Sequence, residues 1–127
     1  MFENTKAFSS FAVDDAEKAR PFYGETLGLR TELLEAQIGL LALHLAGDRD
    51  VLIYEKPDFV PATYTVLNFP VDDIDAAVDQ LAARGVSFER YEAFEQDEKG
   101  ISRAGGPPIA WFRDPAGNIL AVLEQQP

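Results

Sequence analysis

The pattern of hydrophobic and polar residues along the chain predicts two similar units, each made of a strand, a helix and three further strands. The clearest helix lies in the second unit, where apolar residues recur at the spacing of one helical face. These residues are Ile74, Ala77, Val78, Leu81 and Ala82. Gly85 is placed to end this helix, because glycine readily adopts the left-handed conformation that often follows a last turn.

The junction between the first strand and the helix occurs twice in the chain. The stretch 11–19, FAVDDAEKA, recurs 58 residues later at 69–77 as FPVDDIDAA. In each copy a pair of aspartates follows an alternating segment and can cap the first N–H groups of a helix. The first helix carries Pro21 beyond its first turn, where proline removes a backbone hydrogen bond. We therefore expect a kink or a shortened helix there.

Three strand-like runs follow each predicted helix. They are 30–34, 40–45 and 51–55 in the first unit, and 86–91, 109–113 and 119–124 in the second. Two βαβββ units predict an α+β fold in a single domain, 1–127. Repeat one covers about 5–57 and repeat two about 62–125.

Turn-forming residues separate the predicted strands. Before the last strand, Asp114 and Pro115 can open a β-turn, and Gly117 can supply its positive φ. The second unit is 11 residues longer than the first, and the extra length falls in the polar, glycine-rich segment Ala93–Pro108. Most loops of this kind are linkers, although some close over a binding site.

Composition narrows the classes of function. Lys and Arg total 11 and Asp and Glu total 22, which gives a net charge of −11. Such acidity argues against nucleic-acid and anionic membrane partners, and it would attract a cationic ligand. The chain has no cysteine, so thiol chemistry is excluded. With no apolar run of membrane-spanning length and no signal-like start, we expect a cytoplasmic protein.

Two segments resemble the signatures of one protein family. Phe22–Leu29 reads FYGETLGL at the end of the first helix, and Trp111–Asn118 reads WFRDPAGN before the last strand. With two βαβββ units in this order, the chain resembles the vicinal oxygen chelate superfamily, which includes glyoxalase I, the bleomycin-resistance proteins and the extradiol dioxygenases. The resemblance implies a curled eight-stranded mixed sheet that forms a cup, helices on its outside, and a homodimer.

The resemblance also implies where a metal would be held. Enzymes of this family bind a divalent ion through His or Glu on the first, fourth, fifth and eighth strands. The matching positions here are Phe8, Leu52, Val66 and Ala121, none of which can donate a lone pair. Divalent ions require oxygen, nitrogen or sulfur donors, and the chain has a single histidine, His44. We therefore expect no metal and no other cofactor.

Alternation of side chains along the strands selects some of the residues that would line the cup, and the family resemblance implies that Tyr54, Trp111 and Arg113 line it too. In the segment 65–71, we expect Thr65, Leu67 and Phe69 beneath the helix, which leaves Asn68 toward the cup. The expected ligand-binding residues are Phe8, Ser10, His44, Tyr54, Tyr64, Asn68, Trp111 and Arg113. Aromatic surface with a few polar groups is typical of small-molecule pockets. A purely structural interpretation is that Phe8, Leu52, Val66 and Trp111 fill the cup as a second core.

These observations favour a metal-free protein that binds a small aromatic or cationic organic ligand, similar to the bleomycin-resistance branch. The alternative is an enzyme, either a glyoxalase-like lyase or isomerase or a ring-cleaving dioxygenase. It would need a metal at non-standard ligands, or acid–base chemistry by His44, Tyr54 or Glu55. The sequence assigns no catalytic residue. A domain that only pairs with another chain through a sheet edge is a third possibility.

Overall fold

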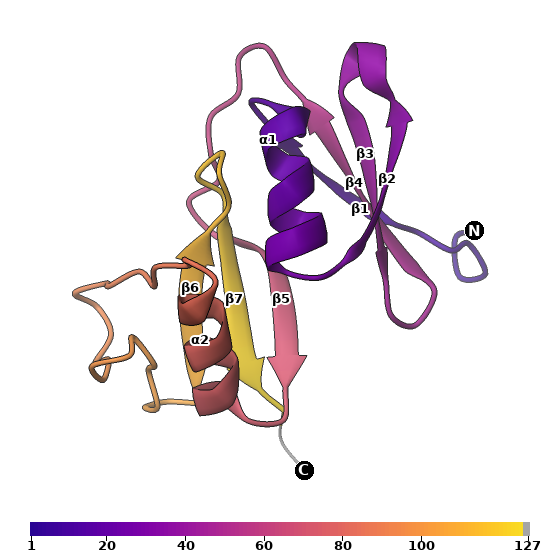
Figure 1. The fold of residues 1–127 in the computed structure, drawn as a ribbon. Coiled ribbons are helices and arrows are strands. Elements are labelled where there is room, and N and C mark those ends of the chain that lie inside the picture. The colour runs from indigo at the N-terminus through magenta and orange to yellow at the C-terminus, as the bar shows by residue number, and fades with distance from the viewer. Residues whose placement is uncertain (126–127) are drawn as a thin grey trace. The chain divides into compact units, whose positions relative to one another are not determined.

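The computed structural model describes residues 1–125 of the chain. They form two compact units, Met1–Val60 and Pro61–Pro127, which we call unit 1 and unit 2 (Figure 1). Each unit has its own sheet and its own helix, and each is described separately below. The longest helix among the described residues has ten residues, and none is long and apolar enough to cross a membrane.

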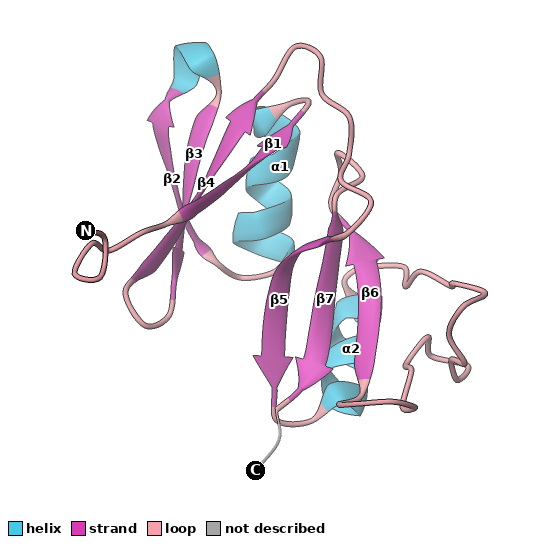
Figure 2. Cartoon of the chain, turned by 180° about the vertical axis from the view of Figure 1, so that it is seen from behind, coloured by secondary structure: helices cyan, strands magenta, loops and turns pink. Residues whose placement is uncertain are grey.

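Unit 1 is a four-stranded mixed sheet with a helix against one face (Figure 2). Its strands are β1 (Ser9–Val13), β2 (Arg30–Glu35), β3 (Leu40–Leu45) and β4 (Arg49–Glu55), in the order β1-β4-β3-β2. β1 and β4 are parallel, and the other neighbours are antiparallel. The side chains of Val13, Leu41, Leu43 and Ile53 are fully buried. They form the core between the sheet and α1 (Ala16–Pro21).

Pro21 ends α1, as the sequence predicts. The chain continues as a π-helical turn, η1 (Phe22–Thr26), in which the N–H of Leu27 donates to the carbonyl of Phe22 at 2.9 Å. The fully buried ring of Tyr23 lies 6.1 Å from that of Phe11 and 5.2 Å from that of Phe22. The FY segment is therefore a packing element of the core.

Unit 2 is a three-stranded mixed sheet in the order β5-β7-β6, with α2 against one face (Figure 2). Its elements are β5 (Thr65–Val71), α2 (Ile74–Ala83), β6 (Ile109–Arg113) and β7 (Ile119–Glu124). The carboxylate of Asp73 caps α2 by accepting from the N–H of Ala76 at 3.1 Å. Gly85 follows the last turn with φ at 90°. Both ends of α2 therefore match the prediction.

The strand expected at 86–91 is not formed, so residues 1–125 contain seven strands and not eight. Phe88 makes a single bridge to Phe112, and the N–H of Glu89 donates to the carbonyl of Trp111 at 2.8 Å. Beyond that point the backbone forms hydrogen bonds with a side chain instead of with a neighbouring strand. The amide of Gln96 accepts from the N–H of Tyr91 and donates to the carbonyl of Glu89, both at 2.8 Å. The α+β arrangement of the two units is otherwise as predicted.

A bulge in β5 changes the direction of its first residue. Thr65 pairs with Ile119, but Leu67 pairs with Leu120, so Val66 is an extra residue in β5. Thr65 therefore shares a face with Ile119 and not with Leu67. The prediction that Thr65 packs beneath the helix is wrong, because strict alternation does not allow for an inserted residue.

The turn between β6 and β7 is held by the carboxylate of Asp114. One carboxylate oxygen accepts from the N–H of Ala116 at 3.0 Å and from that of Asn118 at 2.8 Å. The other oxygen accepts from the side-chain amide of Asn118 at 3.2 Å, and both side chains are buried. Gly117 has φ at 96°, as the predicted turn requires.

Replacing Asp114 by alanine should lower the free energy of unfolding by about 2–3 kcal/mol, because it leaves buried N–H groups without an acceptor. Asp14→Ala is the matched control, since Asp14 is an exposed aspartate in unit 1 and should leave stability unchanged. Urea unfolding followed by circular dichroism measures both variants. Equal midpoints for the two variants would show that the carboxylate does not hold this turn.

Candidate functional site

One face of the unit 2 sheet is covered by α2, and the pairing register identifies the residues on the opposite, open face. Trp111 pairs with Ala121, and Ala121 pairs with Asn68, so these three residues form one row across the strands. Arg113 pairs with Ile119 in the neighbouring row. The row of Arg113 also contains Thr65 because of the bulge in β5.

A hollow of about 390 Å³ opens over this face. It is lined by Thr63, Tyr64, Thr65, Tyr91, Phe94, Trp111 and Ile119. Four of these side chains are aromatic and two are small hydroxyl residues, and no charged side chain of the described residues is among them. We call this feature the aromatic hollow.

Three aromatic rings meet in the aromatic hollow. The ring of Phe94 lies 4.9 Å from that of Trp111 at an angle of 32°, and the ring of Tyr91 stands nearly edge-on to the indole at 5.4 Å. Such offset and edge-to-face pairs are the arrangements that aromatic rings favour. Tyr64 is 70 % exposed and Phe94 is 49 % exposed, so large apolar surfaces face water at this place.

Tyr91 and Phe94 owe their positions to the segment that replaces the expected strand. They begin and end one turn, in which the N–H of Phe94 donates to the carbonyl of Tyr91 at 3.0 Å. The side chain of Gln96 fixes this turn through the bonds described above and also donates to the carbonyl of Gly100 at 2.8 Å. A four-residue turn tied at both ends thus holds two rings against the indole of Trp111.

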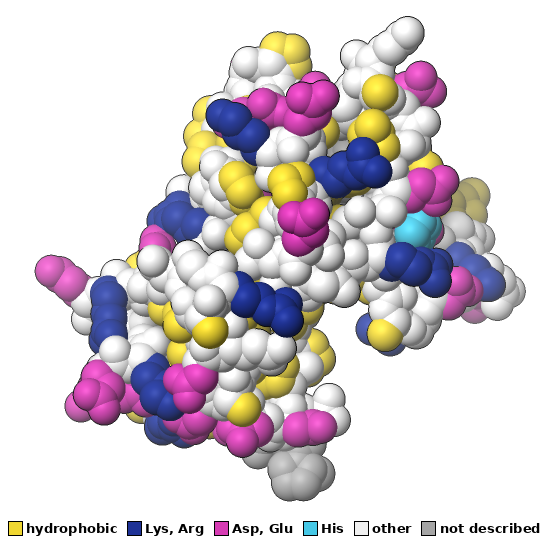
Figure 3. Space-filling view, in the orientation of Figure 1, with side chains coloured by type: hydrophobic (Ala, Val, Ile, Leu, Met, Phe, Trp, Pro, Cys, Tyr) yellow, Lys and Arg dark blue, Asp and Glu magenta, His cyan; other side chains and the backbone are white. Residues whose placement is uncertain are grey.

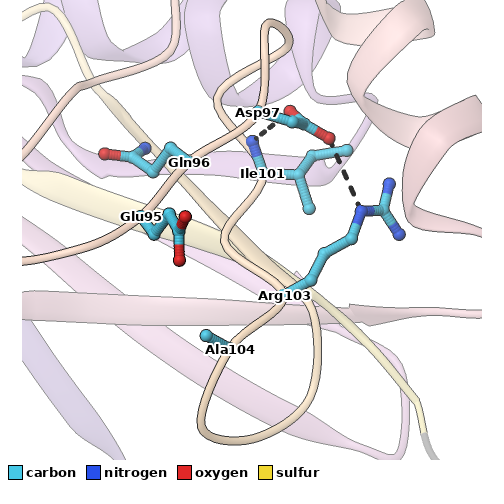
Figure 4. A pocket seen from close by; sticks show the side chains of 6 residues that line it. All are labelled: Glu95, Gln96, Asp97, Ile101, Arg103 and Ala104. Atoms are coloured by element: carbon cyan, nitrogen blue, oxygen red, sulfur yellow. Dashed lines mark hydrogen bonds and ion pairs between the residues drawn. The ribbon is translucent and has the colours of Figure 1, made fainter.

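The rest of the loop is fastened to α2 by ion pairs. The guanidinium of Arg103 donates to both carboxylate oxygens of Asp75, at 2.9 and 3.0 Å. It also lies 3.5 Å from the carboxylate of Asp97 (Figure 4). Lys99 lies 3.1 Å from Asp79. Basic and acidic side chains lie next to one another over this part of the surface (Figure 3). The hollow of about 400 Å³ beside Arg103 is therefore bordered by groups that already bind each other.

Arg113, an expected ligand-binding residue, is engaged by the protein itself. Its Nε donates to the carboxylate of Glu89 at 2.5 Å, and its Nη1 donates to the carbonyl of Gly117 at 2.8 Å. The hydrogen bond to Glu89 raises the pKa of Arg113 above its ordinary value. Arg113 lies on the open face but does not line the aromatic hollow, and the same holds for Asn68.

Tyr91 and Phe94 belong to the aromatic hollow but were not among the expected site residues. The residue pattern predicts Tyr91 at the end of a strand and Phe94 in a polar linker. The available signal was the presence of two aromatic side chains at the start of the 11 extra residues of the second unit. Aromatic side chains are not expected in a linker that is exposed only to water.

The other four expected residues lie in unit 1. Ser10 pairs with Leu52 and Ala12 pairs with Tyr54, which places Ser10 and Tyr54 on the face of the sheet opposite the buried side chains. Tyr54 is 38 % exposed, and Phe8 precedes β1 and is 64 % exposed. Of the eight expected residues, the structure brings Tyr64 and Trp111 together in one hollow.

His44 lies between two carboxylates on the same face. Its Nδ1 is 2.8 Å from Asp50, and its Nε2 is 3.0 Å from Glu32. The hydrogen bond to Asp50, followed by that to Glu32, raises the pKa of His44 above its ordinary value. Both ring nitrogens are therefore engaged, and three adjacent strands are linked through one imidazole.

The residues present do not fit the metal that the family resemblance implies. Phe8, Leu52, Val66 and Ala121 offer only carbon at the four matching positions. Within residues 1–125 no group of three or more His, Asp or Glu side chains is arranged to hold a metal ion.

Comparisons with solved structures support the fold. TnmS3, an antibiotic binding protein from Streptomyces sp. CB03234, is 24 % identical, with a TM-score of 0.69 over 97 % of this chain and 98 % of that one. Lactoylglutathione lyase from Agrobacterium tumefaciens is 22 % identical, with a TM-score of 0.61 over 96 % and 95 %. The fosfomycin resistance protein FosX from Listeria monocytogenes is 15 % identical, with a TM-score of 0.69 over 94 % and 90 %. No curated protein matches the sequence.

At these identities the solved structures show the fold alone, and their different functions do not select one for this chain. The sequence itself is more specific, since it matches one family over residues 7–122. The chain belongs to the Glyoxalase/Bleomycin resistance protein/Dioxygenase superfamily.

Proposed function

We propose that this protein binds a small aromatic or cationic organic ligand in the aromatic hollow of unit 2, without a metal. One observation carries the proposal, namely a hollow of about 390 Å³ lined by four aromatic side chains. Its volume lies in the range of about 300–1,000 Å³ that is usual for small-molecule pockets. Ring faces attract other flat rings by stacking and cations through their negative faces, so they suit either kind of ligand.

Exposure of the hollow supports a ligand over a structural role. Side chains that only fill a core are buried, whereas Tyr64 and Phe94 leave 70 % and 49 % of their surface in water. Covering them with a ligand ring would remove apolar surface from water, which is favourable in proportion to the area buried. TnmS3, which shares the fold, is an antibiotic binding protein, so the fold accommodates a binding role. The proposal includes a homodimer, which the family resemblance implies.

The enzyme alternative has no comparable support from the residues. Its three acid–base candidates are His44, which is held by two carboxylates, Tyr54, and Glu55. Glu55 already accepts a hydrogen bond from the N–H of Ala16 at 2.9 Å, at the start of α1. None of the three lines the aromatic hollow.

Replacing Tyr64 by alanine should weaken ligand binding by about 1 kcal/mol, or roughly fivefold in Kd, because one stacking surface is lost. Candidate ligands come from a panel of neutral and cationic aromatic compounds. Trp111 is the single tryptophan, so its fluorescence reports on the hollow. Tyr54→Ala in unit 1 is the matched control and should bind normally. Ligands that bind without changing the emission of Trp111 would place the site elsewhere.

Purified protein incubated with excess Mn²⁺, Ni²⁺ or Zn²⁺ and then dialysed should retain well under one ion per chain. The reason is that carbon side chains at the four family positions provide no coordination energy. Elemental analysis by mass spectrometry makes the measurement. One tightly held ion per chain would refute the metal-free proposal and favour the enzyme alternative.

The pKa of His44 should lie above its ordinary value of 6.5, and Asp50→Asn should lower it. The stabilisation from this pair should be complete below the unfolded-state pKa and should be lost as pH rises through the higher folded-state value. His44 is the single histidine, so its imidazole proton resonance can be followed by NMR without assignment of others. Asp58→Asn should leave the titration unchanged. A pKa below 6.5 would show that the two carboxylates do not hold a protonated ring.

A further inference from the structure

The hydroxyl of Tyr91 is a buried polar group without a hydrogen-bond partner. Within residues 1–125 it is the one buried side-chain nitrogen or oxygen atom that lacks such a partner. Burial, and then the charge of Glu89, raises the pKa of this hydroxyl, so the phenol keeps its proton. Tyr91 is also one of the residues that line the aromatic hollow. A residue of the hollow thus carries a proton donor that has no acceptor among the described residues.

None of the neighbouring polar groups among the described residues forms a hydrogen bond with this hydroxyl. Glu89 accepts from Arg113, and Arg113 also donates to the carbonyl of Gly117. The lining is otherwise made of rings, the hydroxyls of Thr63, Tyr64 and Thr65, and the side chain of Ile119. A buried donor with no partner is rare in folded proteins, because its desolvation is not compensated. Such a group at a binding hollow is satisfied when a ligand brings the acceptor.

We propose that the hydroxyl of Tyr91 donates a hydrogen bond to the ligand, and that the ligand is a neutral, flat ring system with an acceptor atom at its edge. This inference rests on the proposed function and narrows it. The flat shape follows from the ring faces of Trp111 and Phe94, which would contact the ligand from the hollow side. The acceptor follows from the donor of Tyr91.

The same residues argue against a cation as the ligand. No carboxylate lines the hollow among the described residues, and the nearby carboxylate of Glu89 is neutralised by Arg113. A cation entering the hollow would leave the hydroxyl of Tyr91 without an acceptor. Because the hydroxyl is shielded from water, the ligand must displace a covering group to reach it. The ring of Phe94, which is 49 % exposed, lies 6.4 Å from that of Tyr91.

Two probes of nearly equal shape distinguish a neutral ligand with an acceptor atom from a cationic ligand. Isoquinoline is neutral at pH 8 and accepts a hydrogen bond at its ring nitrogen, whereas N-methylisoquinolinium is a permanent cation with no acceptor. Each is titrated into the wild-type protein, Tyr91→Phe and the matched control Tyr54→Phe, which lies outside the aromatic hollow. Binding is followed through the indole N–H resonance of Trp111, the single tryptophan, which reports on weak ligands by NMR.

We expect the wild-type protein and Tyr54→Phe to bind isoquinoline at least fivefold more tightly than N-methylisoquinolinium. Tyr91→Phe should abolish this preference and leave binding of the cation unchanged. Without ligand, Tyr91→Phe should be at least as stable as the wild type in thermal unfolding, because the lost hydroxyl had no partner.

The results that would overturn the inference are distinct from those that would overturn the proposed function. Equal or tighter binding of the cation by the wild-type protein, or a preference that survives in Tyr91→Phe, refutes the role of the hydroxyl while leaving the aromatic hollow as the binding site. A clear loss of stability in Tyr91→Phe would show that the hydroxyl already has a partner. If neither probe shifts the resonance of Trp111 at millimolar concentration, the proposed function falls as well.

Discussion

The aromatic hollow depends on the hydrogen bonds that the side chain of Gln96 forms with the backbone. A primary amide has a donor and an acceptor side, as a peptide group does, so it can take the place of a neighbouring strand for a short distance. Gln96 does this for Glu89 and Tyr91 and also binds Gly100. The chain can therefore leave the sheet after Glu89 while the carbonyl of Glu89 and the N–H of Tyr91 keep hydrogen-bond partners. The turn that results places Tyr91 and Phe94 against Trp111 instead of continuing the sheet.

The sequence predicted the features of the fold that depend on short-range chemistry. The caps of both helices, the end of α2 at Gly85, the interruption at Pro21 and the turn at Asp114 each follow from one or two residues and their neighbours. The sequence did not reveal the bulge at Val66 or the loss of the strand at 86–91. Both depend on pairing partners that are distant in the chain, and a residue pattern does not show which backbone groups those partners occupy.

The candidate site was predicted only in part, because it too depends on residues that are distant from one another in the chain. Tyr64 was expected in the site from alternation and Trp111 from the family resemblance, but Phe94 lies in a segment with no periodic pattern. The role of Arg113 was also misjudged by sequence alone. Its charge suggested a contact with the ligand, yet it binds Glu89, a residue 24 positions away with which no sequence pattern pairs it. A charged side chain pairs with groups that are close to it in space, and only the folded structure shows which groups those are.

The burial of Ala121 bears on how this protein relates to the metal enzymes of its superfamily. Ala121 has no exposed surface and lies between Asn68 and Trp111 in one row of the sheet. A glutamate introduced at this position would bury an unpaired carboxylate beside an indole, which costs several kcal/mol before any ion could compensate it. The other three family positions would still offer only carbon. A single substitution at Ala121 would therefore lower stability without creating a metal site.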